Sequence, residues 1–359
     1  MVDGITSWMK STYSAMDLDG LKISTTAFED CPRDVFDSVH RCGLDIVTVP
    51  DRKKHPIQYM VRVHGLLRDG HFDVIHVCCN SALAAFELVE AKRRRITMRI
   101  AHSHNTQCEH PFLNNVLGPM FRWSVTDRYA CGVAAGKWLF GTLPFTVIPN
   151  GKDLPIYTFS TEVRETVRGE LGLLGGEIVY GHVGAFNEQK NHEKLIDIFS
   201  ELYRRNSSCR LVLVGEGRLM SDIQGKVKAL GIEKAVRFLG RRDDVPRLLN
   251  AMDCMVFPSL HEGLPNVVLE WQLNGLPVVM SDAITDECVF TPLVRKLSIE
   301  SSVIEWADLV DAAVGGRDRM GDSSAAIDAA AATGYDIRDN AAMLRQLYLE
   351  GAKRCNLEK

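Results

Sequence analysis

Short apolar runs alternate along the chain with longer segments in which apolar residues fall on one face of a helix. The short runs predict buried strands and the longer segments predict amphipathic helices, an alternation typical of parallel sheets covered by helices on both faces. In the first half, strands are predicted at 21–27, 45–49, 73–78, 97–102, 128–132 and 146–149. Helices are predicted between them, near 5–16, 32–41, 56–69, 81–93 and 112–124.

A turn-rich segment, VIPNGKDLP at 147–155, divides the chain, and the same alternation resumes after it. Strands are predicted at 178–184, 210–214, 235–239, 254–257 and 277–280. Helices are predicted near 189–204, 218–229, 244–251, 265–274 and 302–313, and an alanine-rich stretch at 323–333 leads to a last helix near 337–354. We therefore expect an α/β fold with two Rossmann-like, doubly wound domains, at 1–152 and 153–335, whose strand ends face a central cleft. The segment 336–359 is expected to be a helix that packs back toward the N-terminal domain.

The beginning of the chain departs from this pattern. A Rossmann unit is expected to open with a strand before its first glycine turn, but Gly4 is followed at once by a helical pattern. We therefore expect that the first strand is missing here, and that about 10–15 further residues upstream supply it in the native protein.

Composition excludes several classes of protein. The chain has 359 residues, of which 46% are hydrophobic and 25% charged, as in soluble globular proteins. No apolar run reaches the roughly 18–20 residues needed to cross a bilayer, and the first residues do not resemble a secretory signal. The ten cysteines include no CxxC pair, so we expect reduced core thiols in a cytoplasmic protein and no metal site. The net charge of −4 argues against nucleic acid as a partner. Basic clusters lie at 52–54 and 92–95. They are either solvated surface or a contact for an anionic group, such as a lipid headgroup or a pyrophosphate-bearing acceptor.

The strongest chemical signal is PSLHEGLPNVVLEWQLNGLPVV at 258–279. HEGLP predicts a loop, and the helix after it is expected to begin near Pro265, a residue suited to a first turn. The free N–H groups at such a helix start bind anions or sugar hydroxyls. We expect a ligand that carries sugar hydroxyls to contact this segment. Glu262 can accept hydrogen bonds from sugar hydroxyls, and Glu270 can bind both hydroxyls of a ribose. The ligand would also contact the intervening residues Gly263, Leu264, Pro265 and Asn266.

A second signal is VGAFNEQKNHEKLIDIF at 183–199, where a strand ends at Gly184 and a polar loop leads into a helix. Lys190 lies near the helix start, where the helix dipole disfavours a cation unless it faces an anion such as a diphosphate. A third signal is MRIAHSHNT at 98–106, which places His102 and His104 at a strand end, the edge where doubly wound domains bind ligands.

These segments resemble the retaining, GT-B glycosyltransferases of the E-x7-E family, and most of all their bacterial capsule and exopolysaccharide branch. Glu262 and Glu270 match the family's paired glutamates, Lys190 matches its lysine, and His104 matches its strand-end histidine. The chain departs from the family at Ala185, where an arginine is usual, and Gly4 alone represents the family's glycine loop. Arg241 or Arg242 could fill the role of the missing arginine.

The resemblance implies transfer of a sugar from a nucleotide diphosphate-sugar, commonly UDP-linked, with retained anomeric configuration and no metal or other cofactor. Lys190 would stabilise the leaving diphosphate, Glu262 would orient the sugar, and His104 would lie near it. A saccharide or lipid-linked saccharide is the expected acceptor, with possible peripheral contact at the cytoplasmic membrane face. The alternatives are a nucleotide-sugar epimerase of the same fold, a weakened transferase that serves as a binding partner and, least favoured, a dehydrogenase.

Overall fold

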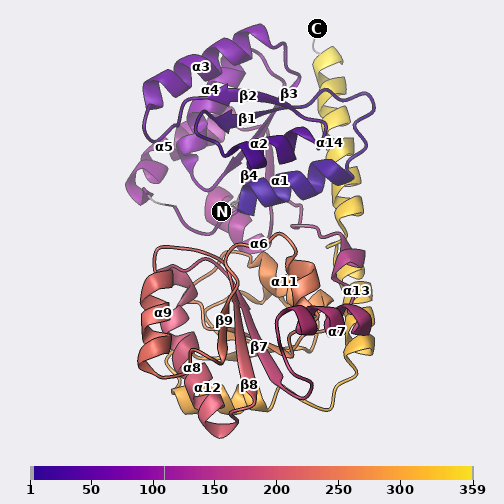
Figure 1. Ribbon diagram of the computed structural model, residues 1–359. Helices are drawn as coiled ribbons and strands as arrows, with labels where there is room; N and C mark the ends of the chain where they lie inside the picture. The colour runs from indigo at the N-terminus through magenta and orange to yellow at the C-terminus, as the bar shows by residue number, and fades with distance from the viewer. Residues whose placement is uncertain (1–3, 109, 358–359) are drawn as a thin grey trace. The chain divides into compact units, whose positions relative to one another are not determined.

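The computed structural model describes residues 4–108 and 110–357 (Figure 1). They form two compact units. The C-terminal unit holds 153–333, and the N-terminal unit joins the chain up to Lys152 with the segment that begins at Gly334. Each unit is an α/β structure with parallel strands, so the predicted α/β fold class is confirmed.

The C-terminal unit is built on a six-stranded sheet in the order β12-β11-β10-β7-β8-β9, and each neighbouring pair of strands is parallel. The strands are β7 (Ile178–Val183), β8 (Cys209–Val214), β9 (Val236–Phe238), β10 (Cys254–Phe257), β11 (Val278–Ser281) and β12 (Val294–Leu297). The chain runs outward from β7 to β9, then returns to the other side of β7 and runs outward again. The direction of winding therefore reverses between β7 and β10, the place where doubly wound sheets bind ligands.

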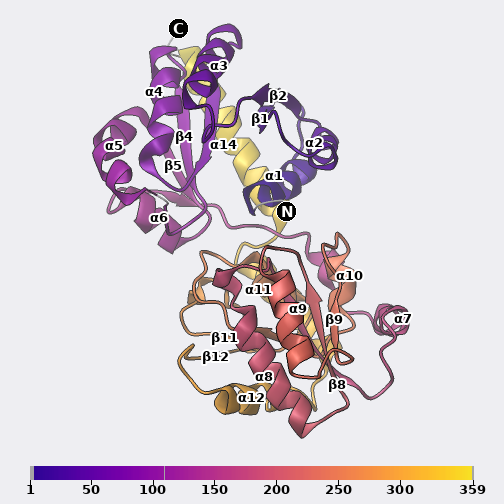
Figure 2. The same cartoon turned by 60° about the vertical axis from the view of Figure 1, so that its left-hand side comes forward.

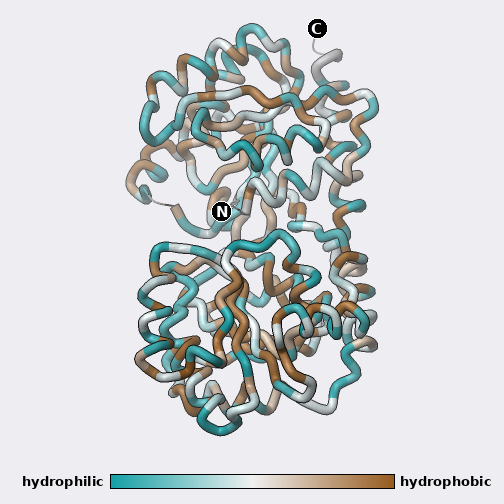
Figure 3. The backbone as a smooth tube through the Cα atoms, in the orientation of Figure 1, coloured by the Kyte–Doolittle hydropathy of each residue, from teal (hydrophilic) through white to brown (hydrophobic). Residues whose placement is uncertain are grey.

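Helices cover both faces of this sheet (Figure 2). On one face, α8 (His192–Arg205), α9 (Met220–Ala229) and α12 (Val303–Asp311) share an apolar core with the strands. On the other face, Trp271 of α11 (Asn266–Leu273) packs edge-on against Phe257 of β10. α13 (Arg319–Ala332) contacts α11, and α10 (Val245–Leu249) contacts α7 (Thr161–Glu170). Figure 3 shows the most hydrophobic segments along the strands, as expected for a sheet buried on both faces.

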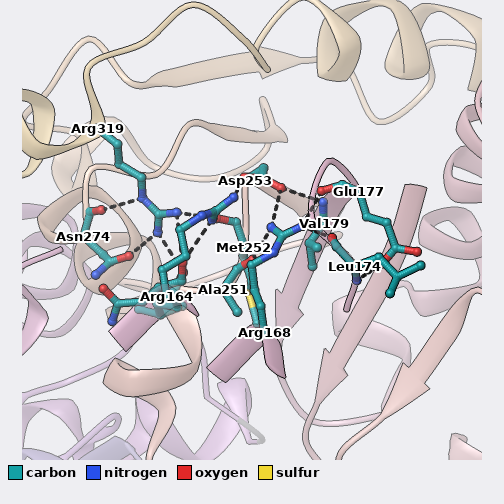
Figure 4. Close-up of polar contacts among 12 residues, drawn as sticks. Arg164, Arg168, Leu174, Glu177, Val179, Ala251, Met252, Asp253, Asn274 and Arg319 are labelled. Carbon is teal, nitrogen blue, oxygen red and sulfur yellow. Dashed lines mark hydrogen bonds and ion pairs between the residues drawn. The ribbon is translucent and has the colours of Figure 1, made fainter. Parts of the chain in front are cut away.

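A network of arginines fastens α7 and α13 to this sheet (Figure 4). The Asp253 carboxylate accepts hydrogen bonds from Arg164 at 2.6 Å, from Arg168 at 3.3 Å and from the Val179 amide at 2.7 Å. Arg319 donates to Asn274 and to backbone carbonyls that precede β10, including Leu249 at 2.7 Å. Burial, together with the neighbouring charge of Arg164, lowers the pKa of Arg319 to about 9.

We expect Asp253→Ala to destabilise the protein by about 2–3 kcal/mol. Removing one partner of a buried ion pair costs about 3–5 kcal/mol, and the loss is reduced here because the Asp253 side chain is 20% exposed. The free energy of unfolding in urea measures the effect. Asp286→Ala, which removes an ion pair at a carboxylate that is 83% exposed, is the matched control. Equal losses in the two variants would contradict the role assigned to the network.

The N-terminal unit has two parallel sheets. One pairs β1 (Ser24–Phe28) with β2 (Asp45–Val49), and the other has the order β3-β4-β5-β6. The strands of the second sheet are β3 (Val74–Cys79), β4 (Met98–Ser103), β5 (Asp127–Ala130) and β6 (Thr146–Val147). The helices are α1 (Gly4–Ala15), α2 (Arg33–His40), α3 (Pro56–Asp69), α4 (Ala85–Arg93), α5 (Pro111–Ser124), α6 (Val133–Phe140) and α14 (Ile337–Leu357).

The four-stranded sheet is covered on both faces. On one face, Trp8 of α1 and Tyr348 of α14 belong to a core with Met98 and Ile100 of β4. On the other face, residues of α4, α5 and α6 pack around Ala101. The last helix of the chain therefore completes the core of the N-terminal unit, and α14 runs beside α1 in Figures 1 and 2.

Candidate functional site

Two loops meet in the C-terminal unit at the point where the winding of the chain reverses, between β7 and β10. The loop after β7 runs from Gly184 to the short helix Glu188–Lys190, and the loop after β10 leads to α11. The Leu260 amide donates to the Gln189 carbonyl at 2.8 Å, and the Gln189 side chain donates to the His261 carbonyl at 2.9 Å. These bonds hold the two loops together at the edge where ligands of such sheets bind.

Lys190 and Glu262, two of the predicted residues, are in direct contact. Lys190 Nζ lies 2.7 Å from Glu262 Oε1, and the side chains are only 15% and 8% exposed. Gln189 Nε2 donates to the second carboxylate oxygen at 3.0 Å, and the ammonium group of Lys190 lies 4.8 Å from the centre of the Phe257 ring. This arrangement fixes the ammonium group at the loop. An anion bound there would interact with the ammonium group together with Glu262.

Gly184 permits this position of Lys190. A β-carbon at residue 184 would lie 3.3 Å from the Lys190 stem and 2.9 Å from Nε2 of His182. Two further glycines, in the loop VGEG at 214–217, allow this loop to lie against the same backbone. A β-carbon at Gly215 would lie 2.0 Å from the Gly184 carbonyl oxygen, and one at Gly217 would lie 2.4 Å from the Phe186 carbonyl oxygen. The glycines of this loop are therefore required by packing.

We expect Gly184→Ala to weaken binding of a nucleotide diphosphate about tenfold, equivalent to 1.4 kcal/mol. The new methyl group must displace Lys190 or His182, so the cation moves away from its position at the loop. Gly225→Ala in α9 is the control, since its β-carbon would have no heavy atom within 4 Å. Titration calorimetry measures the affinity of both variants for the nucleotide diphosphate. Unchanged affinity in Gly184→Ala would show that Lys190 does not belong to the binding site.

The histidines beside Lys190 remain neutral at physiological pH. Burial lowers the pKa of His192 to about 4, with a further contribution from the charge of Lys190. Burial also holds the pKa of His182 well below its usual range. His192 stacks on Phe186, with ring centres 4.0 Å apart. Lys190 therefore supplies the positive charge at this place, and the histidines support it as packing groups.

The other predicted donor-binding residues lie at the start of α11. The loop residues Gly263, Leu264 and Pro265 precede the helix, which begins at Asn266, one residue later than predicted. No side chain in the described part of the chain caps this end, and Asn266 Oδ1 is buried without a hydrogen-bond partner there. The free amides and this orphaned oxygen leave polar groups for a ligand to satisfy.

Glu270 lies in the second turn of α11, and the Tyr157 hydroxyl donates a hydrogen bond to it. Burial and the charge of Glu270 raise the pKa of Tyr157. Neither Tyr157 nor Gln189 was identified from the sequence, because each is distant from its glutamate along the chain. Ala185 lies in the loop after β7, and its carbonyl accepts a bond from the Asn187 amide at 2.8 Å. Arg242 is paired with Asp244 at 2.7 Å.

His104 and Gly4 belong to the N-terminal unit. His104 directly follows β4, so its predicted place at a strand end is correct, and its ring centre lies 4.1 Å from that of His102. Gly4 is the first residue of α1, so it begins a helix; the residues before it lie outside the described chain. Trp8 of the same helix packs against His104 with ring centres 4.9 Å apart.

The architecture has counterparts among solved structures. HepE of Anabaena, crystallised with UDP and glucose, superposes with a TM-score of 0.78 over 98% of this chain and 97% of its own, at 18% identity. This neighbour has the GT-B fold, and the expected pair of Rossmann-like domains is thereby confirmed. The fold therefore defines the chain as a GT-B protein, and the sequence comparisons identify its class of enzyme.

The EpsF protein of Bacillus subtilis, named as a glycosyltransferase, is 27% identical in an alignment of 360 positions that covers 96% of this chain and 93% of EpsF. The UDP-Gal:alpha-D-GlcNAc-diphosphoundecaprenol alpha-1,3-galactosyltransferase of Escherichia coli is 32% identical over 41% of this chain and 39% of its own length. Residues 177–310 match the profile of the family described as glycosyl transferases group 1, and they contain Lys190, Glu262 and Glu270. The chain is thus a glycosyltransferase, as the sequence predicted, and its residues 177–310 resemble the group 1 family.

Proposed function

We propose that the C-terminal unit binds the diphosphate of a nucleotide sugar, most commonly UDP-linked, between the loops that follow β7 and β10. The observation that carries this proposal is the Lys190–Glu262 pair at the reversal point of the sheet. Solved neighbours in complex with UDP and with UDP-glucose support the choice of donor. A panel of nucleotide sugars in a thermal-shift assay tests it, because a bound ligand raises the melting temperature by mass action.

The same geometry suggests how the reaction is accelerated. When the bond between sugar and phosphate breaks, negative charge grows on the diphosphate, and preorganised cations and amides stabilise it. Lys190 and the free amides at the start of α11 supply these groups, so we propose that transfer requires no divalent cation. Omitting Mg²⁺ and Mn²⁺ from the assay should leave kcat unchanged, and a strict requirement for either would refute this step.

We further propose that the anomeric configuration is retained, as the resemblance to the E-x7-E family implies. Glu262 would orient the sugar, and Glu270 would bind the ribose hydroxyls. Proton NMR of the first product formed reports its anomeric configuration directly. A product of inverted configuration would remove the retaining mechanism and leave the donor site intact.

The proposed acceptor is a saccharide or lipid-linked saccharide of a polysaccharide pathway, reached at the cytoplasmic membrane face. The names of two relatives support it, a galactosyltransferase acting on a diphosphoundecaprenol-linked sugar and a Vi polysaccharide biosynthesis protein.

Among the helices that the structure describes, none combines the length and the apolar character that a membrane span needs. One face of α5 is nevertheless apolar and exposed, with Phe112 77%, Val116 58% and Trp123 59% accessible. Lys92 places its ammonium group 3.5 Å from the Trp123 ring, so cationic and aromatic groups are combined as at membrane surfaces.

We expect a Phe112→Ser/Trp123→Ser variant to lose most of the binding to vesicles that contain anionic lipid. Both aromatic rings would otherwise bury apolar surface in the interface. Leu174→Ser, at a residue that is 67% exposed in the C-terminal unit, is the matched control. Co-sedimentation with vesicles measures all variants, and equal binding by the double variant and the control would eliminate α5 as the contact.

A further inference from the structure

One face of the four-stranded sheet in the N-terminal unit gathers three side chains that bind transition metals. His76 and Cys78 lie two residues apart on β3 and share a face, and the parallel register places His102 of β4 opposite Cys78. One nitrogen or sulfur atom of each residue lies within 4.8 Å of the other two. Cys79, the next residue, packs on the opposite face with the core of α4 and α5.

We propose that His76, Cys78 and His102 form a zinc site beneath α1 and α14. Two imidazoles and one thiolate are the soft and borderline ligands that zinc prefers, and three protein ligands leave one position for a water molecule. The proposal does not rest on the donor-binding roles assigned to Lys190, Glu262 and Glu270, which belong to the C-terminal unit.

The distances need little adjustment to fit the ion. His76 Nε2 lies 3.1 Å from His102 Nδ1, and tetrahedral zinc with ordinary bond lengths holds two nitrogens about 3.3 Å apart and a nitrogen and a sulfur about 3.6 Å apart. The widest separation therefore has to shrink by about 1 Å. The other ring nitrogen of His102, Nε2, is buried and has no hydrogen-bond partner in the described chain.

A tyrosine hydroxyl beside His76 gives this ligand the hydrogen-bond partner that metal-bound histidines commonly have. Zinc ligands commonly bind through one ring nitrogen and donate the other N–H to an oxygen. His76 Nδ1 lies 2.6 Å from the Tyr348 hydroxyl of α14, and that hydroxyl lies 2.8 Å from the hydroxyl of Tyr13 in α1. Trp8 packs edge-on against His102 with ring centres 5.0 Å apart. Both helices would thus fix the orientation of the ligands and limit access of water.

Metal analysis of the purified full-length chain tests the proposal. We expect about one zinc per chain, and a chain loaded with Co²⁺ should show thiolate-to-cobalt charge transfer in the near ultraviolet together with visible bands of a tetrahedral ion. Binding should release the thiol proton, so that metal uptake increases with pH. The cobalt spectrum of the unaltered chain is informative by itself, because the charge-transfer band requires a cysteine ligand.

Two neighbouring variants locate the site. Cys78→Ser should abolish the charge-transfer band and reduce zinc to background, whereas Cys79→Ser, on the other face of the same strand, should retain both. Circular dichroism verifies that each variant is folded. A chain that contains no zinc and develops no cobalt band would overturn the proposal and leave a hydrogen-bonded chain of histidines and tyrosines. Equal behaviour of the two serine variants would overturn it as well.

Discussion

The Lys190→Ala variant is expected to lose about 10²–10³-fold in kcat while its affinity for the donor falls by a smaller factor. Charge on the diphosphate is greatest in the transition state, so a cation at this position acts more strongly there than in the ground state. Lys190 is held for this task by Glu262 at 2.7 Å, and the missing β-carbon of Gly184 leaves room for its stem. Steady-state kinetics and a calorimetric titration of UDP-sugar separate the two effects.

The buried ion pair complicates a single substitution. Removing Lys190 leaves Glu262 without its partner, which costs stability in addition to catalysis. A Lys190→Met/Glu262→Gln double variant leaves no unpaired buried charge, and its comparison with the Glu262→Gln single variant isolates the contribution of Lys190. Lys226→Ala, which breaks the Lys226–Asp197 ion pair, is the control for loss of a lysine. Equal losses in affinity and in kcat/KM for Lys190→Ala would show that Lys190 only holds the bound donor.

Glu270→Ala is expected to weaken nucleotide-sugar binding by about 10–100-fold. A charged acceptor that binds hydroxyl groups contributes about 1.5–3 kcal/mol, and each 1.4 kcal/mol is a factor of ten. Since Glu270 is on a helix that begins four residues earlier, its position is fixed by the packing of α11. Calorimetric titration of UDP, and of pyrophosphate, which lacks the ribose, measures whether the loss of affinity depends on the ribose.

Tyr157→Phe is the companion variant for Glu270. It removes the hydroxyl that donates to Glu270 and leaves the carboxylate in place, so donor affinity should change far less than in Glu270→Ala. If both variants lose affinity equally, Glu270 acts by anchoring Tyr157 rather than by binding ribose. If neither loses affinity, the ribose assignment is wrong.

The fold could be predicted because short apolar runs alternate regularly with amphipathic helical segments, and this alternation is typical of parallel sheets covered by helices. The runs at 178–184 and 254–257 became β7 and β10, and the reversal of winding between them follows from the topology of such sheets. β12 (Val294–Leu297) was missed because it is an edge strand whose sequence, VRKL, contains two cations and no continuous apolar run. Helix α7 was missed as well, since its sequence is almost entirely polar and the arginine network fastens it to the sheet.

The candidate site was predictable only in part. Spacing within one segment identified Glu262, Glu270 and the start of α11, because loop and helix are continuous in the chain. The contact of Lys190 with Glu262 depends on the neighbouring positions of β7 and β10, which no local pattern specifies. Likewise, His76 and Cys78 meet His102 only through the register of β3 with β4, and the expectation of no metal site considered linear spacing alone.

The central claim is that the nucleotide sugar binds at the loops that follow β7 and β10. Hydrogen–deuterium exchange of the full chain, with and without UDP-glucose, tests it most directly. The account predicts slower exchange at 184–191 and 258–266 on binding, and a much smaller change in the Glu270→Ala variant at a ligand concentration near the dissociation constant of the unaltered chain. Protection confined to other segments, or unchanged exchange in both loops under saturating ligand, would contradict it.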